Sequence, residues 1–232
     1  MLRTSFVHKI LLIGLPILLV SGPAIHVSAG VNQWTSIGPT GGAVGALVVD
    51  PLTPTTVYAA AGTGGVFKTT DGGGSWNPVN VGLAGSDVQN LVMDPTTPAV
   101  LYAVAGIGGV FKTTDGGGSW NPVNVGLAGS DVVDLVIDPT TPATLYAATL
   151  GFSVWEGLYK TTNGGSSWSP INLDVPQHYL NSLVINPNRP TTLYAGTADG
   201  VFKSTNSGES WAPINTGLSD DDITEQNRAP GS

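Results

Sequence analysis

Cysteine is absent from all 232 residues, and charged residues make up only 10% of the chain. The absence of cysteine excludes disulfides, thiolate catalysis, zinc–thiolate centres and lipidation of an N-terminal cysteine. Only one of the three histidines, His178, lies beyond residue 30, so a site with several histidine ligands is excluded too. We therefore expect a fold held together by packing alone, with no metal and no cofactor.

Basic residues are also scarce, because 8 Lys and Arg stand against 16 Asp and Glu. Beyond residue 30 the remaining cations are scattered along the chain: Lys68, Lys112, Lys160, Arg189, Lys203 and Arg228. A nucleic-acid partner requires a cluster of cations to neutralise its phosphates. The sequence therefore predicts no nucleic-acid binding.

No apolar run is as long as a membrane span. The longest run, Ile10 to Val20, is well short of the roughly 20 residues that a spanning helix needs. Arg3 and Lys9 precede it, and Val27-Ser28-Ala29 supplies small residues for cleavage. We predict a signal peptide over residues 1–29, cleaved after Ala29, and a secreted or periplasmic mature chain; an uncleaved anchor is the alternative.

Glycine and proline are abundant, with 32 and 17 residues, which favours a turn-dense all-β chain. The chain also repeats itself, because Gly64–Val88 and Gly108–Val132 are identical in sequence. Two aromatic residues recur in step with this duplication: Trp76, Trp120, Trp168 and Trp211, and Tyr58, Tyr102, Tyr146 and Tyr194. These positions define four tandem copies.

Each copy contains four short β-rich runs, which we name A to D. In the first copy they are Ala46–Val49, Val57–Ala60, Val66–Thr69 and Trp76–Val79. Run A is apolar on successive residues, which predicts a strand buried on both faces. Run D carries a proline after its Trp, and proline is tolerated only at a sheet edge. Burial is therefore expected to decline from A to D.

Four antiparallel strands that repeat about every 40–45 residues are typical of a β-propeller blade. We predict an all-β propeller over residues 30–218, with four complete four-stranded blades at about 44–80, 88–124, 132–172 and 180–215. Trp34–Ile37 matches run D alone, as one extra N-terminal strand, and residues 219–232 are expected to be a disordered polar tail.

Three arrangements are open for this partial propeller: a closed four-bladed ring, an arc completed by a second chain, or a fragment of a longer propeller. An arc would leave apolar strand edges exposed, which favours self-association. We therefore expect a homodimer that completes the propeller, or a truncated parent, rather than a stable monomer.

The turn between runs C and D has the same pattern in every copy, Ser/Thr-x-Asp/Asn-x-Gly-x-x-Trp. It resembles the Asp-box, or BNR repeat, in which the Asp or Asn side chain accepts backbone N–H groups of its own turn. Two of the four copies carry Asn, which keeps this bonding but loses the charge, so we interpret the motif as structural rather than as a calcium or acid site. Its residues are Asp71, Gly73, Trp76, Asp115, Gly117, Trp120, Asn163, Gly165, Trp168, Asn206, Gly208 and Trp211.

The resemblance covers residues 34–217 and extends to several kinds of Asp-box propeller: xyloglucanase-type glycoside hydrolases, sialidases, sortilins and photosystem II assembly factors. A sialidase would need three arginines, and only Arg189 and Arg228 lie beyond residue 30. The xyloglucanase resemblance implies a catalytic Asp where this chain has Gly62, and Gly106 occupies the same place in the second copy. The resemblance implies an arginine patch for an assembly factor and a cysteine-rich segment for a sortilin, and the sequence has neither. We therefore favour a protein without catalysis, since a fold does not fix an activity.

Departures from the repeat gather in the loops between runs B and C and between D and the next A, which share one face of a propeller. We propose this loop face as the ligand site, with an aromatic and acidic patch suited to a polysaccharide or a protein segment. Its candidate residues are Phe152, Trp155, Glu156, Asp174, His178, Tyr179 and Asp199. The alternative is that these loops are merely longer and cover the edge of a blade. A partial or degenerate glycoside hydrolase is the alternative function.

Overall fold

The computed structural model describes residues 38, 43–83, 85–127, 131–150, 157–171 and 180–218. Residues Met1–Ser36 form one unit and Ile37–Ser232 the other, and all described residues belong to the second unit. The predicted signal peptide, the predicted strand at Trp34–Ile37 and the predicted tail at 219–232 lie outside the described residues. None of the described residues belongs to a helix long and apolar enough to span a membrane.

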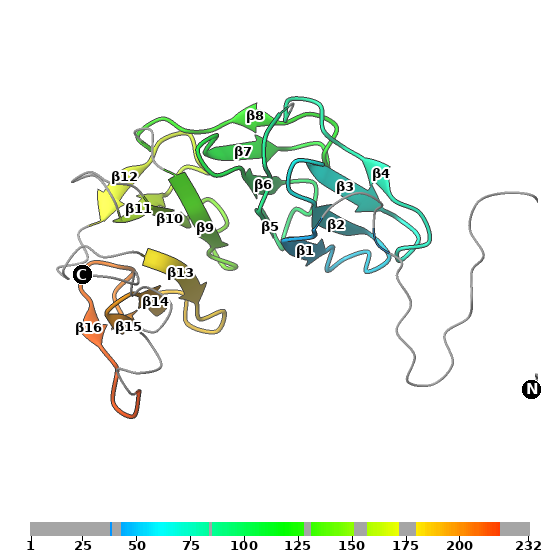
Figure 1. Ribbon diagram of the computed structural model, residues 1–232. Coiled ribbons are helices and arrows are strands. Elements are labelled where there is room, and N and C mark those ends of the chain that lie inside the picture. The colour runs from blue at the N-terminus through cyan, green and yellow to red at the C-terminus, as the bar shows by residue number, and fades with distance from the viewer. Residues whose placement is uncertain are drawn as a thin grey trace, which may run out of the picture. The chain divides into compact units, whose positions relative to one another are not determined.

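The described residues form sixteen strands in four antiparallel sheets of four strands each, and no helix (Figure 1). The first blade contains β1 (Ala46–Val49), β2 (Val57–Ala60), β3 (Val66–Thr69) and β4 (Asn77–Pro78). The second contains β5 (Asn90–Met93), β6 (Leu101–Val104), β7 (Val110–Thr113) and β8 (Asn121–Pro122). The third contains β9 (Asp131–Ile137), β10 (Leu145–Leu150), β11 (Gly157–Thr161) and β12 (Ser169–Ile171). The fourth contains β13 (Leu180–Ile185), β14 (Leu193–Thr197), β15 (Gly200–Ser204) and β16 (Ala212–Pro213).

Strands follow one another across each sheet in chain order, so every blade is a simple meander. In the first blade, Leu47 pairs with Ala59, Ala59 pairs with Phe67, and Phe67 pairs with Pro78. This order confirms the prediction of an all-β propeller with four blades. The three longer strands of the first copy have the predicted bounds, whereas its outer strand is shorter than predicted, because only Asn77 and Pro78 pair with β3.

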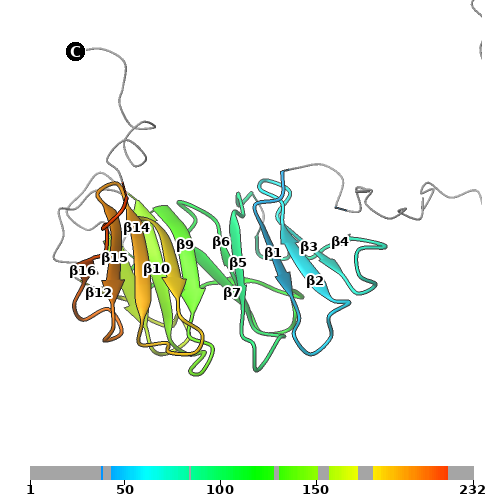
Figure 2. The ribbon, with the colours of Figure 1, turned by 90° about the horizontal axis from the view of Figure 1, so that it is seen from below.

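This connectivity divides the loops between the two ends of the strands (Figure 2). The loops that join second to third strands and fourth to first strands emerge at one end, which we call the loop face. The loops that join first to second strands and third to fourth strands emerge at the other end, which we call the Asp-box face.

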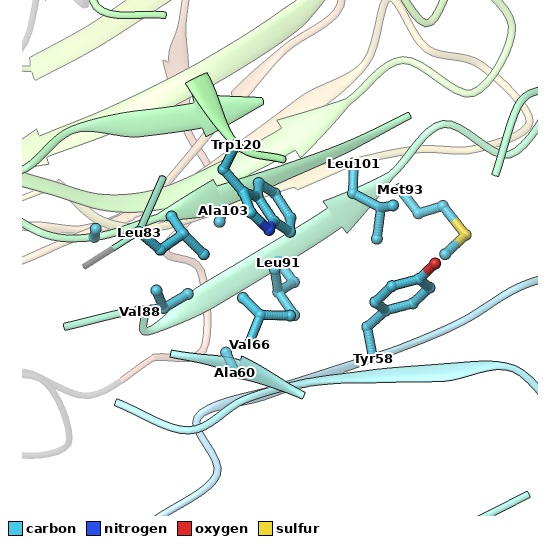
Figure 3. Packing of buried hydrophobic residues seen from close by; sticks show 11 residues of the cluster. Tyr58, Ala60, Val66, Leu83, Val88, Leu91, Met93, Leu101, Ala103 and Trp120 are labelled. Atoms are coloured by element: carbon cyan, nitrogen blue, oxygen red, sulfur yellow. The ribbon is translucent and has the colours of Figure 1, made fainter. Parts of the chain in front are cut away.

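The core lies between blades rather than within one. Tyr58 and Val66 of the first blade pack against Leu91, Met93 and Leu101 of the second (Figure 3). Equivalent clusters join the second blade to the third and the third to the fourth. The first strands β1, β5, β9 and β13 also contact one another in this order, so the extensive contacts between described strands join consecutive blades.

One prediction about burial was wrong. The first strand of each blade was expected to be the most buried, but the second strand is: in the second blade β6 is buried throughout, whereas β5 alternates between half-buried and buried residues. Both strands of this blade have a neighbouring blade over each face, but β6 also has a hydrogen-bonded strand on each side, whereas β5 is an edge of its sheet. The apolar composition of the first strand therefore reflects packing against neighbouring blades on its faces, not complete enclosure.

Candidate functional site

Hydrogen bonds within the turn hold the acidic side chains of the Asp-box face. The Asp71 carboxylate accepts bonds from the Thr69 hydroxyl at 2.7 Å, from the Ser75 backbone N–H at 2.9 Å and from the Ser75 hydroxyl at 2.7 Å. Asp115 has the same partners in the second blade, Thr113 and Ser119.

These bonds favour the charged form of both carboxyl groups. The bond from Thr69, followed by those from Ser75, lowers the pKa of Asp71 far below its ordinary value. The bond from Thr113, followed by those from Ser119, lowers the pKa of Asp115 to about 2. Both groups are therefore anions at neutral pH that cap their own turns, and they are poor proton donors there.

Asn serves the same turn equally well in the third and fourth blades. The Asn163 side-chain oxygen accepts bonds from the Thr161 hydroxyl at 2.8 Å and the Ser167 N–H at 3.0 Å, while its amide group donates to the Ser167 hydroxyl. The turn requires an acceptor and not a charge. No group of three or more His, Cys, Asp or Glu side chains among the described residues is placed to hold a metal ion.

A tyrosine and a lysine link each of the first three blades to the Asp-box turn of the next. The Tyr58 hydroxyl and the Lys68 ammonium group donate to the Gly116 carbonyl at 3.0 and 3.2 Å, and the Lys68 nitrogen lies 5.1 Å from the Tyr58 ring centroid. Tyr102 and Lys112 bond to Gly164 in the same way, and Tyr146 and Lys160 bond to Ser207. Burial, with a smaller contribution from the charge of Asp94, raises the pKa of Tyr102 to about 12, so its hydroxyl remains a donor.

The loop face is built on turns that asparagine side chains fix in place. The Asn80 side-chain oxygen accepts a bond from the Val66 N–H at 2.7 Å, and its amide group donates to the Gly64 carbonyl at 2.9 Å. Asn124 and Asn215 repeat this pair of bonds in the second and fourth blades. Each of these turns therefore presents a preorganised surface.

Two carboxylates lie over these turns. A Cβ atom added to Gly62 would lie 3.1 Å from an Asp87 carboxylate oxygen, and one added to Gly106 would lie 3.0 Å from the corresponding oxygen of Asp131. Gly62 also pairs with Val88 through two backbone hydrogen bonds of 3.0 Å, which holds Asp87 next to the turn. The Asp87 and Asp131 carboxylates therefore occupy the space into which a side chain from residue 62 or 106 would project.

A third carboxylate, Asp134, connects three blades along the first strands. Asn90 of β5 donates to one of its oxygens at 2.7 Å, and the Leu183 N–H of β13 donates to the other at 2.7 Å. Asp134 itself belongs to β9. Its carboxylate thus fixes the second, third and fourth blades to one another just inside the loop face.

The structure describes one of the seven ligand-site residues that the sequence predicts. Asp199 lies in the turn between β14 and β15 on the loop face, where its backbone N–H donates to the Thr197 hydroxyl at 3.1 Å and its carbonyl accepts a bond from Asn215. The remaining six lie outside the described residues: Phe152, Trp155, Glu156, Asp174, His178 and Tyr179. The predicted patch therefore stays a prediction for those six.

Sequence reasoning missed Asp87, Asp131 and the asparagines that fix the turns. A signal was present, because Asp87 and Asn80 recur 44 positions later as Asp131 and Asn124. They were missed because the predicted site was built from departures from the repeat, whereas these residues are the same in both copies.

The described cations gather at one end of the blades, whereas carboxylates lie at both ends, since Asp50, Asp71, Asp94, Asp115 and Asp138 belong to turns of the Asp-box face. The four described lysines reach toward the Asp-box face, and Arg189 lies in the turn after β13 at the same end. Asp87, Asp131 and Asp199 lie on the loop face. The described lysines and Arg189 thus lie away from the loop face, and the carboxylates there are suited to ligands that donate hydrogen bonds or carry positive charge.

Solved structures similar to this chain are β-propellers. An ancestral GH74 enzyme matches 81% of the chain at 26% identity with a TM-score of 0.64. A GH74 enzyme from Niastella koreensis matches 72% of the chain at 21% identity with a TM-score of 0.61, and YCF48 bound to D1 peptide matches 78% at 18% identity with a TM-score of 0.56. No protein-family model and no curated protein matches the chain.

These likenesses confirm the predicted resemblance to xyloglucanase-type and photosystem II assembly-factor propellers. The chain spans only part of each structure: 26% of the ancestral GH74 enzyme, 28% of the Niastella koreensis enzyme and 57% of YCF48. They therefore support the fold, while the activity of the larger proteins is not thereby assigned to this one.

Proposed function

We propose that this protein is a secreted or periplasmic binding propeller without catalysis, which recognises a polysaccharide or a protein segment at its loop face. The position of two carboxylates carries this proposal: Asp87 and Asp131 lie against the fixed turns of the loop face, while the described cations lie at the opposite end. Carboxylates accept hydrogen bonds from sugar hydroxyls and from lysine or arginine side chains alike.

The rigidity of the turns supports binding rather than loose association. Asn80 and Asn124 each make two hydrogen bonds across their turn, so ordering the surface on binding costs little conformational entropy. Binding of peptides by other propellers gives a precedent for this use of the fold, since YCF48 has been solved bound to D1 peptide.

The first experiment is a retention assay on a panel of soluble polysaccharides that includes xyloglucan, with a short lysine-rich peptide as a separate arm. We expect one arm to bind and the double variant Asp87→Asn with Asp131→Asn to bind at least about tenfold more weakly, because hydrogen bonds to charged groups contribute about 1.5–3 kcal/mol. Trp155→Ala tests the aromatic part of the predicted patch in the same assay.

The matched control is Asp94→Asn with Asp138→Asn. It makes the same chemical change in the turns after β5 and β9 on the Asp-box face, where the fourth blade already uses Asn186 for the same bonds. This control should bind as well as the unaltered protein. Equal loss in both double variants, or no retention in either arm, would contradict the proposal.

A second candidate function, a partial glycoside hydrolase, is supported by one feature. The Asp87 carboxylate lies where a side chain from residue 62 would project, and the xyloglucanase resemblance implies a catalytic Asp at that position. Measuring released reducing ends in the same panel separates the two candidates. Retention without release supports the binding propeller, and release that Asp87→Asn abolishes supports the hydrolase.

Export is part of the proposal and is supported by the pattern of residues 1–29. N-terminal sequencing of the exported protein should begin at Gly30. Export with Met1 still attached would contradict cleavage at Ala29.

A further inference from the structure

The interface between consecutive blades occurs three times within this chain and always joins the same two kinds of surface. We call the surface that packs on the preceding blade the leading face; in the second blade it includes Leu91 and Trp120. We call the surface that packs on the following blade the trailing face; in the first blade it includes Val48, Tyr58 and Val79.

The leading face of the first blade has no partner among the described residues. Leu47 is 63% exposed, whereas its counterparts Leu91, Leu135 and Leu183 are 5%, 1% and 4% exposed. Val49 on the same face is also exposed, whereas its counterpart Met93 is buried. The first blade thus exposes apolar residues on a face that is buried in each of the other three blades.

The trailing face of the fourth blade is likewise uncovered by any described residue. Val184 is 57% exposed and Ile214 is 43% exposed, while their counterparts in the first blade, Val48 and Val79, pack into the core between blades. A Cβ atom added to Gly217 would meet nothing within 4 Å, whereas one added to Gly82 would meet the Trp120 backbone of the following blade.

Polar groups at the two ends match as well. Lys203 lies 5.6 Å from the Tyr194 ring centroid, the same pairing that bonds to a carbonyl of the next Asp-box turn in the other three blades. The corresponding residue of the first Asp-box turn is Gly72, which is exposed and has the same backbone conformation, with a φ of 71° against 68° for its counterpart Gly116. A Cβ atom at Gly116 would meet the Tyr58 hydroxyl and the Lys68 nitrogen, whereas one at Gly72 would meet nothing within 4 Å.

We infer that two copies of this chain join end to end, with the leading face of each first blade on the trailing face of the other copy's fourth blade. Two identical junctions then form about one twofold axis, and each copy uses both of its open faces. The product is a ring of eight blades, within the range of 4–8 that propellers adopt.

A second copy is the occupant that the structure favours, because one chain carries both halves of an interface that it already forms three times. Each junction would cover Leu47 and Val184 and would supply the Gly72 carbonyl to Tyr194 and Lys203 of the partner. This inference concerns the ends of the repeat and does not depend on what the loop face binds.

Sedimentation equilibrium of the full chain, over a range of concentrations, tests the inference. We expect a dimer for the unaltered protein and a shift toward monomer, by at least about thirtyfold in the dissociation constant, for Leu47→Asp and for Val184→Asp, since loss of a buried anchor has an effect of this size. Leu52→Asp is the matched control, because Leu52 is at least as exposed as Leu47 and Val184 but lies in the turn after β1; this variant should remain a dimer.

Mixing the two variants gives the decisive result. Leu47→Asp leaves an intact trailing face and Val184→Asp leaves an intact leading face, so an equimolar mixture should form a dimer with one good junction although neither variant dimerises well alone. Circular dichroism checks that each variant is folded, and Tyr194→Phe, which removes only a hydroxyl, replaces any variant that is not. A monomeric unaltered protein, open-ended larger assemblies, or a mixture that stays monomeric would overturn the inference.

Discussion

At the scale of single residues, the Asp-box turns make stability depend on pH in only two of the four blades. The folded-state pKa of Asp115 is about 2, below its ordinary value of 3.8, and that of Asp71 is lowered for the same reason. A carboxyl group whose pKa is lower in the folded state stabilises the fold above its unfolded pKa, and this contribution is lost as the pH falls through the folded pKa.

We therefore predict that Asp71→Asn with Asp115→Asn reduces the loss of stability between about pH 4 and about pH 2. The turns themselves should persist, because Asn163 and Asn206 already form them. Urea unfolding at a series of pH values measures the effect. The reciprocal change, Asn163→Asp, should add a dependence on pH in the same window, and identical pH profiles for all three proteins would contradict this account.

These turn residues could be predicted from the sequence because their bonds are local. The Asp71 carboxylate bonds within four residues of itself, so the motif contains the whole structure. Asp87 could not be placed in the same way, since its position over Gly62 depends on the pairing of Gly62 with Val88. The described part of the candidate site was therefore found mainly in the structure.

At the scale of elements, the Asp-box turn of the fourth blade contains a residue under strain. Ser207 has a φ of 61°, whereas its counterparts Gly116 and Gly164 are glycines in the same left-handed region. This conformation costs a residue with a Cβ about 1–2 kcal/mol. Replacing the residue with glycine removes this cost, but the greater entropy of glycine in the unfolded chain cancels part of the gain in stability.

Ser207→Gly should therefore stabilise the protein by up to about 1 kcal/mol. The Ser207 carbonyl that accepts bonds from Tyr146 and Lys160 is unaffected by the change. Denaturant unfolding measures the change in stability. The reverse control, Gly164→Ser, should destabilise by at least as much, because a Cβ atom there would also meet the Lys112 nitrogen and the Tyr102 hydroxyl. A lower stability for Ser207→Gly would contradict the assignment of strain.

Strand positions followed from the sequence to within one residue at each end in the first copy, because each run is bounded by glycine, proline or an Asx turn. The relative burial of strands did not follow, since it depends on which faces a neighbouring blade covers. Leu47 and Leu91 are equivalent residues in equivalent strands, yet Leu47 is exposed and Leu91 is buried, because a neighbouring blade covers only Leu91.

At the scale of the whole molecule, the repeat builds a frame of joined blades, and the proposed binding site lies at one end of the strands. Lysine and tyrosine side chains join blades near the Asp-box face, and Asp134 joins three blades near the loop face. Lys68, Lys112 and Lys160 thus each join two blades, and the carboxylates Asp87, Asp131 and Asp199 lie on the loop face. The proposed binding function is based on this arrangement, in which lysines join blades near the Asp-box face and the loop face carries carboxylates.

The most direct test of that function is hydrogen exchange of the protein with and without the ligand that the panel retains. We predict protection of the amides of Gly62–Gly65, Gly106–Gly109 and Ser86–Val88 on the loop face, with no change in the Asp-box turns around Asp71 and Asp115. Protection confined to the Asp-box turns, with the loop face unchanged, would contradict the central claim that this propeller binds through its loop face.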